Sequence, residues 1–265
     1  MYVILYVNVL IITGNSQKEI DDLKRSLKNE FEMKDMGILK HFLGITINRD
    51  HESGILKLSQ KQFALKILER FNMEECKGKS VPLDPGVNLN RDSGGEKCQK
   101  PYREAVGSLM YLMLGSRPDL SFAVNYLSRF QNCYTDEHWN CLKHVLRYIK
   151  YTIDNALTYK RDLEKVPLVG YADADWANDV TDRKSVTGYL FEVFGCTVSW
   201  VSKKQPTISL SSTEAEYIAL CDAAKEAMFL SKVLKDLDVH VETTVIHEDN
   251  QACIQISKNQ LNIKD

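Results

Sequence analysis

Three groups of carboxylates between residues 168 and 252 have residue types that can hold a divalent cation. Asp173 and Asp175 follow an apolar run, Glu214 and Glu216 open a helical pattern, and Asp249 follows a second apolar run. Carboxylate oxygens are the ligands that Mg²⁺ prefers, and Mg²⁺ can activate water and stabilise a leaving oxygen in phosphodiester cleavage. The groups therefore predict a metal site, provided that the elements carrying them converge.

Each group also has an interpretation without a metal. Asp173 and Asp175 alternate with alanines and so share one face of a strand, which on a solvated edge needs no function. Glu214 and Glu216 would complement the positive end of a helix macrodipole, and Asp249 stands where a helix cap is expected. The order of strand end, helix start and strand end favours the metal site, because such positions can meet in space.

The elements expected around these groups form a mixed sheet. The pattern predicts strands at Leu168–Asp173, Thr187–Val193, Thr197–Ser202 and Thr244–Glu248, and helices at about Thr213–Leu237 and Gln251–Ile256. Three strands pairing as a meander, then a helix crossing to a fourth strand, give a mixed sheet with helices on its faces. Trp176 and Trp200 are interpreted as core residues.

The preceding part of the chain is predicted to contain short strands and then helices. Tyr2–Ile12 is rich in β-branched and aromatic residues and interrupted only by Asn8, which predicts two buried strands folded on a turn. A helix capped at Gly14–Ser16 follows, with its apolar face running from Ile20 to Phe31. Further strands are expected at Leu39–Asn48 and Ile55–Leu58, and further helices at Ser59–Phe71, with Ser59 as N-cap, Tyr102–Leu114, Leu120–Phe130 and His138–Tyr148. The stretch Pro82–Lys100 is expected to be a loop or linker.

Composition limits the class of protein. With 265 residues the chain could form one large domain or two ordinary ones, and a net charge of −2 means that contact with nucleic acid would rely on local patches. Seven cysteines without a CxxC pair predict neither a zinc site nor a disulfide framework, so reduced thiols in the cytoplasm or nucleus are expected. Tyr2–Thr13 is too short to cross a bilayer and lacks a basic flank, so we expect no signal peptide, no transmembrane helix and no membrane partner.

Several long motifs resemble the Pol polyproteins of copia-type LTR retrotransposons. Those that resemble the ribonuclease H region are Tyr171–Ala177, Asp182–Tyr189, Ser199–Gln205, Ser211–Leu220, Ala224–Ala227 and Asp249–Gln251. Those that resemble the end of the reverse transcriptase and its connection are Phe31–Gly37, Phe42–Ile45, Val106–Tyr111, Arg117–Asp119, Leu127–Phe130, His138–Trp139 and Leu146–Tyr148. The resemblance implies an α/β chain with a reverse-transcriptase palm/thumb remnant at residues 1–85, a linker and helical connection at 86–160, and a C-terminally truncated ribonuclease H-like domain with a mixed sheet and flanking helices at 161–265.

The same resemblance implies a site composed of Asp173, Glu216 and Asp249. Glu216 is preferred to Glu214 because Glu216–Ala219 matches the Glu-x-x-Ala helix start of the family. Two Mg²⁺ or Mn²⁺ ions would flank the scissile phosphate in the RNA strand of an RNA/DNA hybrid, one activating water and the other supporting the leaving 3′ oxygen. The family has a fourth acidic residue farther along, and Asp265 does not align with it.

A second site of the family is altered in this chain. Tyr6, Val7, Asn8 and Val9 stand where copia-type reverse transcriptases carry Tyr-Val-Asp-Asp. Neither Asn8 nor Val9 supplies an anionic oxygen, so we expect polymerase activity to be lost, and we expect the chain to be a fragment. The alternative to a hybrid-cleaving nuclease is a non-catalytic nucleic-acid-binding module or a decayed retroelement remnant. The oligomeric state is not predicted.

Basic residues could contact a nucleic-acid backbone in two places. Lys203, Lys204 and Gln205 follow the third predicted strand, where they could touch phosphates or protect a sheet edge. Lys61, Lys66, Arg70 and Lys77–Lys79 could contact phosphates or form an ordinary solvated face.

Overall fold

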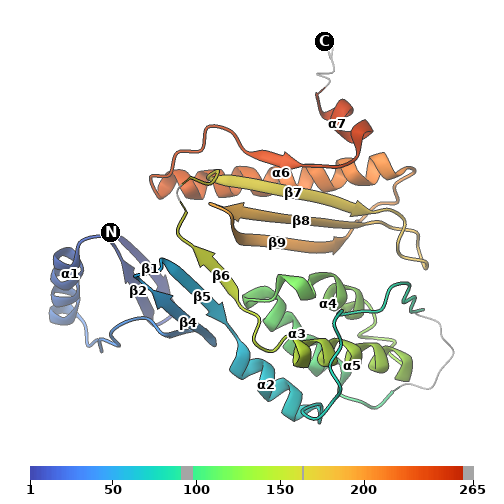
Figure 1. Ribbon diagram of the computed structural model, residues 1–265, viewed down its shortest axis with the longest axis horizontal. Helices are drawn as coiled ribbons and strands as arrows, with labels where there is room; N and C mark the ends of the chain where they lie inside the picture. The colour runs from blue at the N-terminus through green and yellow to red at the C-terminus, as the bar shows by residue number, and fades with distance from the viewer. Residues whose placement is uncertain (91–97, 163, 259–265) are drawn as a thin grey trace. The chain divides into compact units, whose positions relative to one another are not determined.

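The computed structural model describes residues 1–90, 98–162 and 164–258 as a mixed α/β protein (Figure 1). Contacts divide the chain into two compact units, residues 1–47 and residues 48–265. The domain boundaries expected near residues 85 and 160 remain predictions. No helix in the described ranges is both long enough and apolar enough to cross a membrane.

The first unit begins with an antiparallel hairpin. Strand β1 (Tyr2–Tyr6) pairs with β2 (Val9–Thr13), with Tyr6 opposite Val9, and Val7 lies in the connecting turn at φ 53°. The predicted pair of strands around Asn8 is thus confirmed. Their predicted burial is wrong, because β1 is exposed along its whole length and β2 is at most half-buried. A two-stranded ribbon forms too small a sheet to bury its own side chains.

Helix α1 (Gln17–Glu30) follows the hairpin. The Ser16 hydroxyl accepts the backbone N–H of Glu19 at 3.4 Å, so the predicted cap is present. The apolar stripe is at most half-buried, and Phe31 is 61% exposed because the helix ends one residue before it.

The strand predicted at Leu39–Asn48 is interrupted by a tight turn. Leu43 and Gly44 adopt φ values of 48° and 70°, so β3 (His41–Phe42) folds back onto β4 (Ile45–Asp50). Two consecutive residues at positive φ are the geometry of a type I′ hairpin turn, which a period-two pattern does not reveal.

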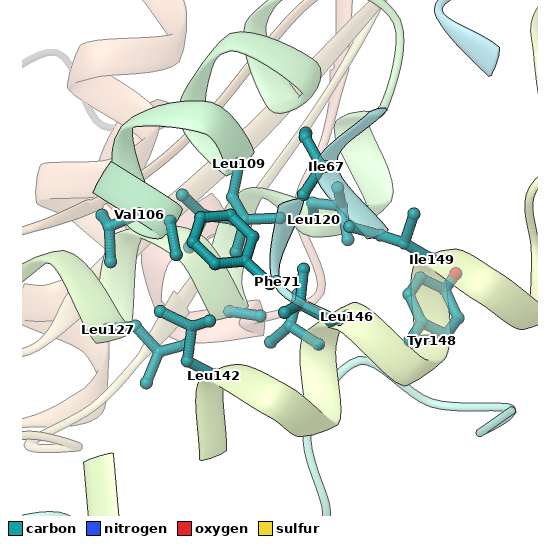
Figure 2. Close-up of a cluster of buried hydrophobic side chains, with 14 of the residues drawn as sticks. Ile67, Phe71, Val106, Leu109, Leu120, Leu127, Leu142, Leu146, Tyr148 and Ile149 are labelled. Carbon is teal, nitrogen blue, oxygen red and sulfur yellow. The ribbon is translucent and has the colours of Figure 1, made fainter. Parts of the chain in front are cut away.

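The first part of the second unit contains a group of helices with a strand before it and a strand after it. Its elements are β5 (Ile55–Ser59), α2 (Lys61–Arg70), α3 (Tyr102–Gly115), the 3₁₀ turn η1 (Pro118–Leu120), α4 (Ser121–Ser128), α5 (Asp136–Tyr151) and β6 (Leu157–Lys160). Figure 2 shows side chains of the four α-helices meeting in one apolar cluster, among them Ile67, Leu109, Leu127 and Leu146. The N-cap position of α2 is Gln60 rather than Ser59, which ends β5 and accepts the Lys61 N–H on its hydroxyl at 3.2 Å.

Part of the predicted linker at Pro82–Lys100 is packed. Leu89 is buried in the helical cluster, and its backbone N–H donates to the Tyr126 hydroxyl at 2.8 Å. Residues 91–97 of that stretch lie outside the described residues, as does Asp265. All seven cysteines belong to the described part of the chain, and each is a free thiol, as predicted.

The C-terminal sheet has the predicted mixed topology. Its elements are β7 (Leu168–Asp175), β8 (Val186–Val193), β9 (Cys196–Lys204), α6 (Ser212–Asp236), β10 (Val245–His247) and α7 (Gln251–Lys258). The strand order is β10-β7-β8-β9, with β10 parallel to β7 and the other pairs antiparallel. Helix α6 runs along this sheet (Figure 1), and its alanines pack against Ala172 and Ala174 of β7. Small side chains on both elements let the helix approach the strand closely.

Trp176 and Trp200, both predicted to be core residues, differ in their surroundings. Trp200 is half-buried, and its indole N–H donates to the Met113 carbonyl oxygen at 3.0 Å. Trp176 is 47% exposed and donates to the Ser209 carbonyl oxygen at 3.1 Å, so its prediction as a core residue is wrong. Strand β7 ends at Asp175, which leaves Trp176 in the following turn instead of on the pleat that faces α6.

Candidate metal centre

The structure brings Asp173, Glu216 and Asp249 together. One carboxylate oxygen from each of the three lies within 4.8 Å of the others. Asp173 comes from β7, Glu216 from the first turns of α6, and Asp249 from the segment between β10 and α7. Strand β10 lies parallel to β7 with His247 level with Tyr171, so the chain beyond β10 runs on beside Asp173. The parallel pairing thus brings Asp249 next to Asp173.

The start of α6 is held by its own polar residues. The Ser211 hydroxyl accepts the Glu214 N–H at 3.2 Å, and the Glu214 carboxylate accepts the Leu210 N–H at 2.7 Å. Glu214 is therefore an exposed capping residue outside the carboxylate cluster. Glu216, two residues later, faces inward, so the geometry separates the two glutamates as the helix-start motif does.

Gln205 ties the end of β9 to this helix start. Its amide NH₂ donates to the Thr187 hydroxyl at 3.0 Å and to the Ala215 carbonyl oxygen at 2.9 Å, and its carbonyl oxygen accepts the Ser209 hydroxyl at 3.2 Å. The residue is only 1% exposed, so the interpretation of Gln205 as a phosphate contact is wrong. It positions the backbone next to Glu216 instead.

The two lysines before Gln205 are engaged in ion pairs. Lys203 pairs with Asp222 at 2.9 Å, and Lys204 pairs with Asp179 at 2.5 Å and Asp182 at 2.7 Å. Since β9 is an edge strand of the described sheet, the lysines stand where edge protection requires charge.

Two of the basic residues considered in α2 are also paired, Lys61 with Asp154 and Arg70 with Glu104. Both basic side chains remain exposed to solvent, so these pairs agree with the interpretation of an ordinary solvated helix face.

Burial and negative charge change the acidity of Glu216. The residue is only 7% exposed, and its Oε2 atom has no hydrogen-bond partner among the described residues. Burial, followed by the charges of Glu248, Asp173 and Asp249, raises the pKa of Glu216 to about 7. A buried carboxylate among like charges is stabilised either by a proton or by a cation.

Asp175 has a separate environment. The Asn178 side-chain NH₂ donates to its carboxylate at 2.5 Å, and burial together with the Asp173 charge raises the pKa of Asp175. It shares the exposed face of β7 with Asp173 but does not belong to the cluster.

Sequence reasoning did not single out Glu248, which directly precedes Asp249 and lies outside the cluster of three carboxylates. Its Oε1 atom accepts the Asn250 N–H at 3.0 Å, while its Oε2 atom is buried and lacks a partner in the described part of the chain. Burial, then the charges of Asp249 and Asp173, raises the pKa of Glu248. The available signal was a glutamate at the end of an apolar strand directly before Asp249.

The donor set fits a hard divalent cation. Every potential ligand atom in the cluster is a carboxylate oxygen, which suits Mg²⁺ or Mn²⁺ better than a soft metal. The neighbouring thiol of Cys253 is fully buried, and burial together with the charges of Glu248 and Glu216 raises its pKa to about 11. In the absence of a metal the thiol is therefore protonated at neutral pH, and hard cations prefer the carboxylate oxygens beside it.

The altered polymerase motif lies at the tip of the first hairpin. Val7 and Asn8 form the turn between β1 and β2, and Val9 begins β2. The hairpin sequence Tyr2–Thr13 contains no aspartate or glutamate, so it offers no carboxylate to a metal.

Comparisons with known proteins find a reverse-transcriptase family model, Pol polyproteins of transposons and a shorter uncharacterized protein. A family model described as reverse transcriptase (RNA-dependent DNA polymerase) matches residues 1–85. The retrovirus-related Pol polyprotein from transposon TNT 1-94 of Nicotiana tabacum is 40% identical over 97% of this chain, and that from transposon RE2 of Arabidopsis thaliana is 37% identical over 98%. This chain spans 20% and 18% of their lengths. An uncharacterized mitochondrial protein of Arabidopsis thaliana is 39% identical over 87% of this chain and 95% of its own length.

Proposed function

Because this chain belongs to the Pol polyprotein family of copia-type LTR retrotransposons, we propose that its C-terminal part is a ribonuclease H-like, metal-dependent nuclease that cleaves the RNA strand of RNA/DNA hybrids. The observation that supports this proposal is the convergence of Asp173, Glu216 and Asp249 from three separate elements. An all-oxygen cluster suits Mg²⁺, and hydrolysis of a phosphodiester is a reaction that such ions promote.

In this proposal the three carboxylates hold the metal beside the scissile phosphate. A bound Mg²⁺ ion would supply water activation and stabilisation of the leaving oxygen. The protein places its ligands on rigid elements: Asp173 on a central strand, and Glu216 on a helix start that Ser211 caps and Gln205 holds to the sheet. Glu216 must release its proton before it can bind a cation, because only the ionised carboxylate is a ligand.

We propose further that the reverse-transcriptase-like segment does not polymerise DNA. The hairpin that carries Asn8 and Val9 provides no carboxylate for the metal ions of that reaction. We therefore expect no primer extension on a primed RNA template with deoxynucleotides and Mg²⁺. Extension by the purified chain would contradict this part of the proposal.

The nuclease proposal is tested with a labelled RNA/DNA hybrid. We expect cleavage of the RNA strand in Mg²⁺ or Mn²⁺, no cleavage in EDTA, and no cleavage of matched RNA/RNA or DNA/DNA duplexes. Asp173→Asn should lower the rate by about 100-fold or more, because removing even an outer-shell partner of a metal costs about 10- to 100-fold. Asp236→Asn, at the exposed end of α6, is the control and should cleave normally.

The alternative function is non-catalytic binding of nucleic acid or a decayed remnant, which the hairpin without carboxylates favours. Wild-type protein that binds the hybrid but leaves it intact, with binding unchanged in Asp173→Asn, would identify a binding module. Absence of both binding and cleavage, together with poor solubility, would identify a decayed element.

A further inference from the structure

We propose that α5 and a short segment packed on it form a surface that binds the phosphate backbone of a nucleic-acid duplex. This surface, which we call the α5 basic surface, consists of the cations Lys77, Lys79, Lys143, Arg147 and Lys150. The inference rests on the proposed function for its choice of partner, but it does not involve the metal centre. Three of the five cations lie on a helix to which the sequence motifs assigned no contact.

One side of α5 carries a row of cations. Lys143, Arg147 and Lys150 are four and three residues apart, so they lie on the same side of the helix, and each remains partly exposed. Leu142 and Leu146 of the same helix point into the apolar cluster, so the row lies outside the core (Figure 2). The row extends over about 10 Å of the helix axis, which matches about three successive phosphates in one strand of a duplex.

The segment Lys77–Lys79 is fastened beside this row. The Arg147 Nε atom donates to the Lys77 carbonyl oxygen at 2.6 Å, and the Lys79 N–H donates to the Arg147 carbonyl oxygen at 3.2 Å. Gly78 packs directly on Tyr151, because a Cβ at position 78 would lie 2.9 Å from the Tyr151 Cβ. Glycine permits this close approach of the backbone. The two lysines of the segment are thereby held next to the cations of α5.

Most of the charge on this surface is not neutralised within the protein. Lys79 pairs with Asp84 at 3.8 Å. The other three lysines of the surface form no ion pair with any residue in the described ranges. Neighbouring like charges repel one another, and a polyanion relieves that repulsion. Since the net charge of the whole chain is −2, these unpaired cations form the kind of local patch that contact with nucleic acid requires.

The helix macrodipole explains only part of the row. Lys150 lies in the last turn of α5, where a cation is favourable without any ligand. Lys143 lies more than one turn earlier, and Lys77 belongs to another segment, so the macrodipole favours neither. Tyr151, which is 66% exposed, adds an aromatic ring beside the cations. Cations next to an exposed aromatic ring are typical of surfaces that follow a nucleic-acid backbone.

Binding of the full chain to a labelled RNA/DNA hybrid in EDTA tests the surface without cleavage. The test variant replaces three lysines of the surface and keeps Arg147, which holds the segment: Lys77→Gln, Lys143→Gln and Lys150→Gln. Each phosphate contact contributes about 0.9 to the slope of log affinity against log salt concentration, so we expect weaker binding and a slope smaller by about three. The control variant removes the same charge from exposed positions elsewhere and should keep the wild-type slope: Lys57→Gln, Lys232→Gln and Lys235→Gln.

Gly78→Ala changes the geometry of the surface but not its charge. The added methyl group meets Tyr151, so the segment must move away from α5. We expect a slope smaller by about one to two as Lys77 and Lys79 leave the row. Gly107→Ala, whose methyl group meets open space, is the matched control. Wild-type binding by a Gly78→Ala protein that circular dichroism shows to be folded would contradict the role of the segment.

The outcomes separate this inference from the proposed function. Unchanged affinity and slope in the lysine variant would overturn the inference, and cleavage that persists in Mg²⁺ would then leave the proposed nuclease intact. Weaker binding by the lysine variant, combined with no cleavage by the wild type in Mg²⁺, would support the surface and contradict the nuclease. If the lysine variant instead loses binding to phosphatidylserine vesicles while its binding to the hybrid is unchanged, the surface contacts lipid, and the inference fails.

Discussion

Glu216 combines three properties that rarely occur in a structural glutamate: burial, an oxygen without a partner, and three carboxylate neighbours. Each property alone has an ordinary explanation at the start of a helix. Together they disfavour the ionised side chain unless a positive charge arrives. The residue therefore couples the stability of the protein to pH and to metal.

The stability of the metal-free protein should fall as pH rises through the neutral range. The pKa of Glu216 is raised from 4.5 to about 7, so between these values the folded state binds a proton that the unfolded state lacks. Stability linked to this group is full below pH 4.5 and is lost as pH rises toward about 7. We expect the Tm in EDTA to fall over this window and the fall to be smaller in Mn²⁺. Glu216→Gln should remove much of the fall, and an equal fall in that variant would contradict the explanation.

At the scale of elements, the site depends on how α6 and the loop after β7 are fastened to the sheet. Gln205 bonds the end of β9 to Thr187 of β8 and to Ala215 of α6. Asp179 accepts from Arg129 of the α4 C-terminus at 3.3 Å and from Lys204 at 2.5 Å. Neither fastening residue touches the carboxylate cluster, yet both hold the segments from which the cluster projects.

Gln205→Ala should destabilise the second unit and weaken metal binding. The change leaves the buried Thr187 hydroxyl without the donor that Gln205 supplies, which costs about 1–3 kcal/mol, and it removes the side-chain bond to the Ala215 carbonyl oxygen at the start of α6. Urea unfolding followed by tryptophan fluorescence measures the loss. Gln17→Ala removes an exposed side-chain bond to Asp21 and should change stability little. An equally small effect for Gln205→Ala would show that the hydrogen bonds of Gln205 contribute little to the free energy of unfolding.

Asp179→Asn should lower the free energy of unfolding more than Asp182→Asn does, although both aspartates pair with Lys204. The Asp179 side chain is 8% exposed and its partner Arg129 is 7% exposed, with Nε and Nη2 of Arg129 already lacking partners in the described structure. Removing the aspartate charge from a buried pair costs about 3–5 kcal/mol. Asp182 is 38% exposed, and its pair with Lys204 should be worth less than about 1 kcal/mol. Equal unfolding free energies for the two variants would refute the ranking.

At the scale of the whole molecule, the two compact units differ in how much apolar surface their side chains bury. Within residues 1–47, all of which the structure describes, no side chain reaches full burial, whereas the second unit contains the extended helical cluster and the core of the sheet. Local stability follows the amount of apolar surface that an element removes from water. The first unit should therefore open far more often than the second.

Hydrogen exchange followed by mass spectrometry tests this difference. We expect amides of β1, β2 and α1 to exchange rapidly and those of β7, β8 and α5 to be protected by several orders of magnitude, since opening free energies range from near zero to the global value. Comparable protection in the two units would contradict the expectation and would mean that the hairpin is covered in solution.

The sequence by itself determined the order of elements, the mixed sheet and the three clustered carboxylates. Alternation along β7, helical periodicity along α6 and cap residues act over a few positions, so these local patterns can be recognised in the chain. The family motifs then selected Glu216 instead of Glu214 without any coordinates.

Only the tertiary structure decided what each side chain meets. It exposed Trp176 and the first hairpin, buried Gln205, introduced a turn at Leu43–Gly44, and left one oxygen of Glu216 buried without a hydrogen-bond partner among the described residues. Burial and charge proximity arise where distant segments pack, as when β10 pairs with β7 and brings Asp249 to the carboxylates of Asp173 and Glu216. A local pattern carries no information on such neighbours, and the chemistry of the site depends on them.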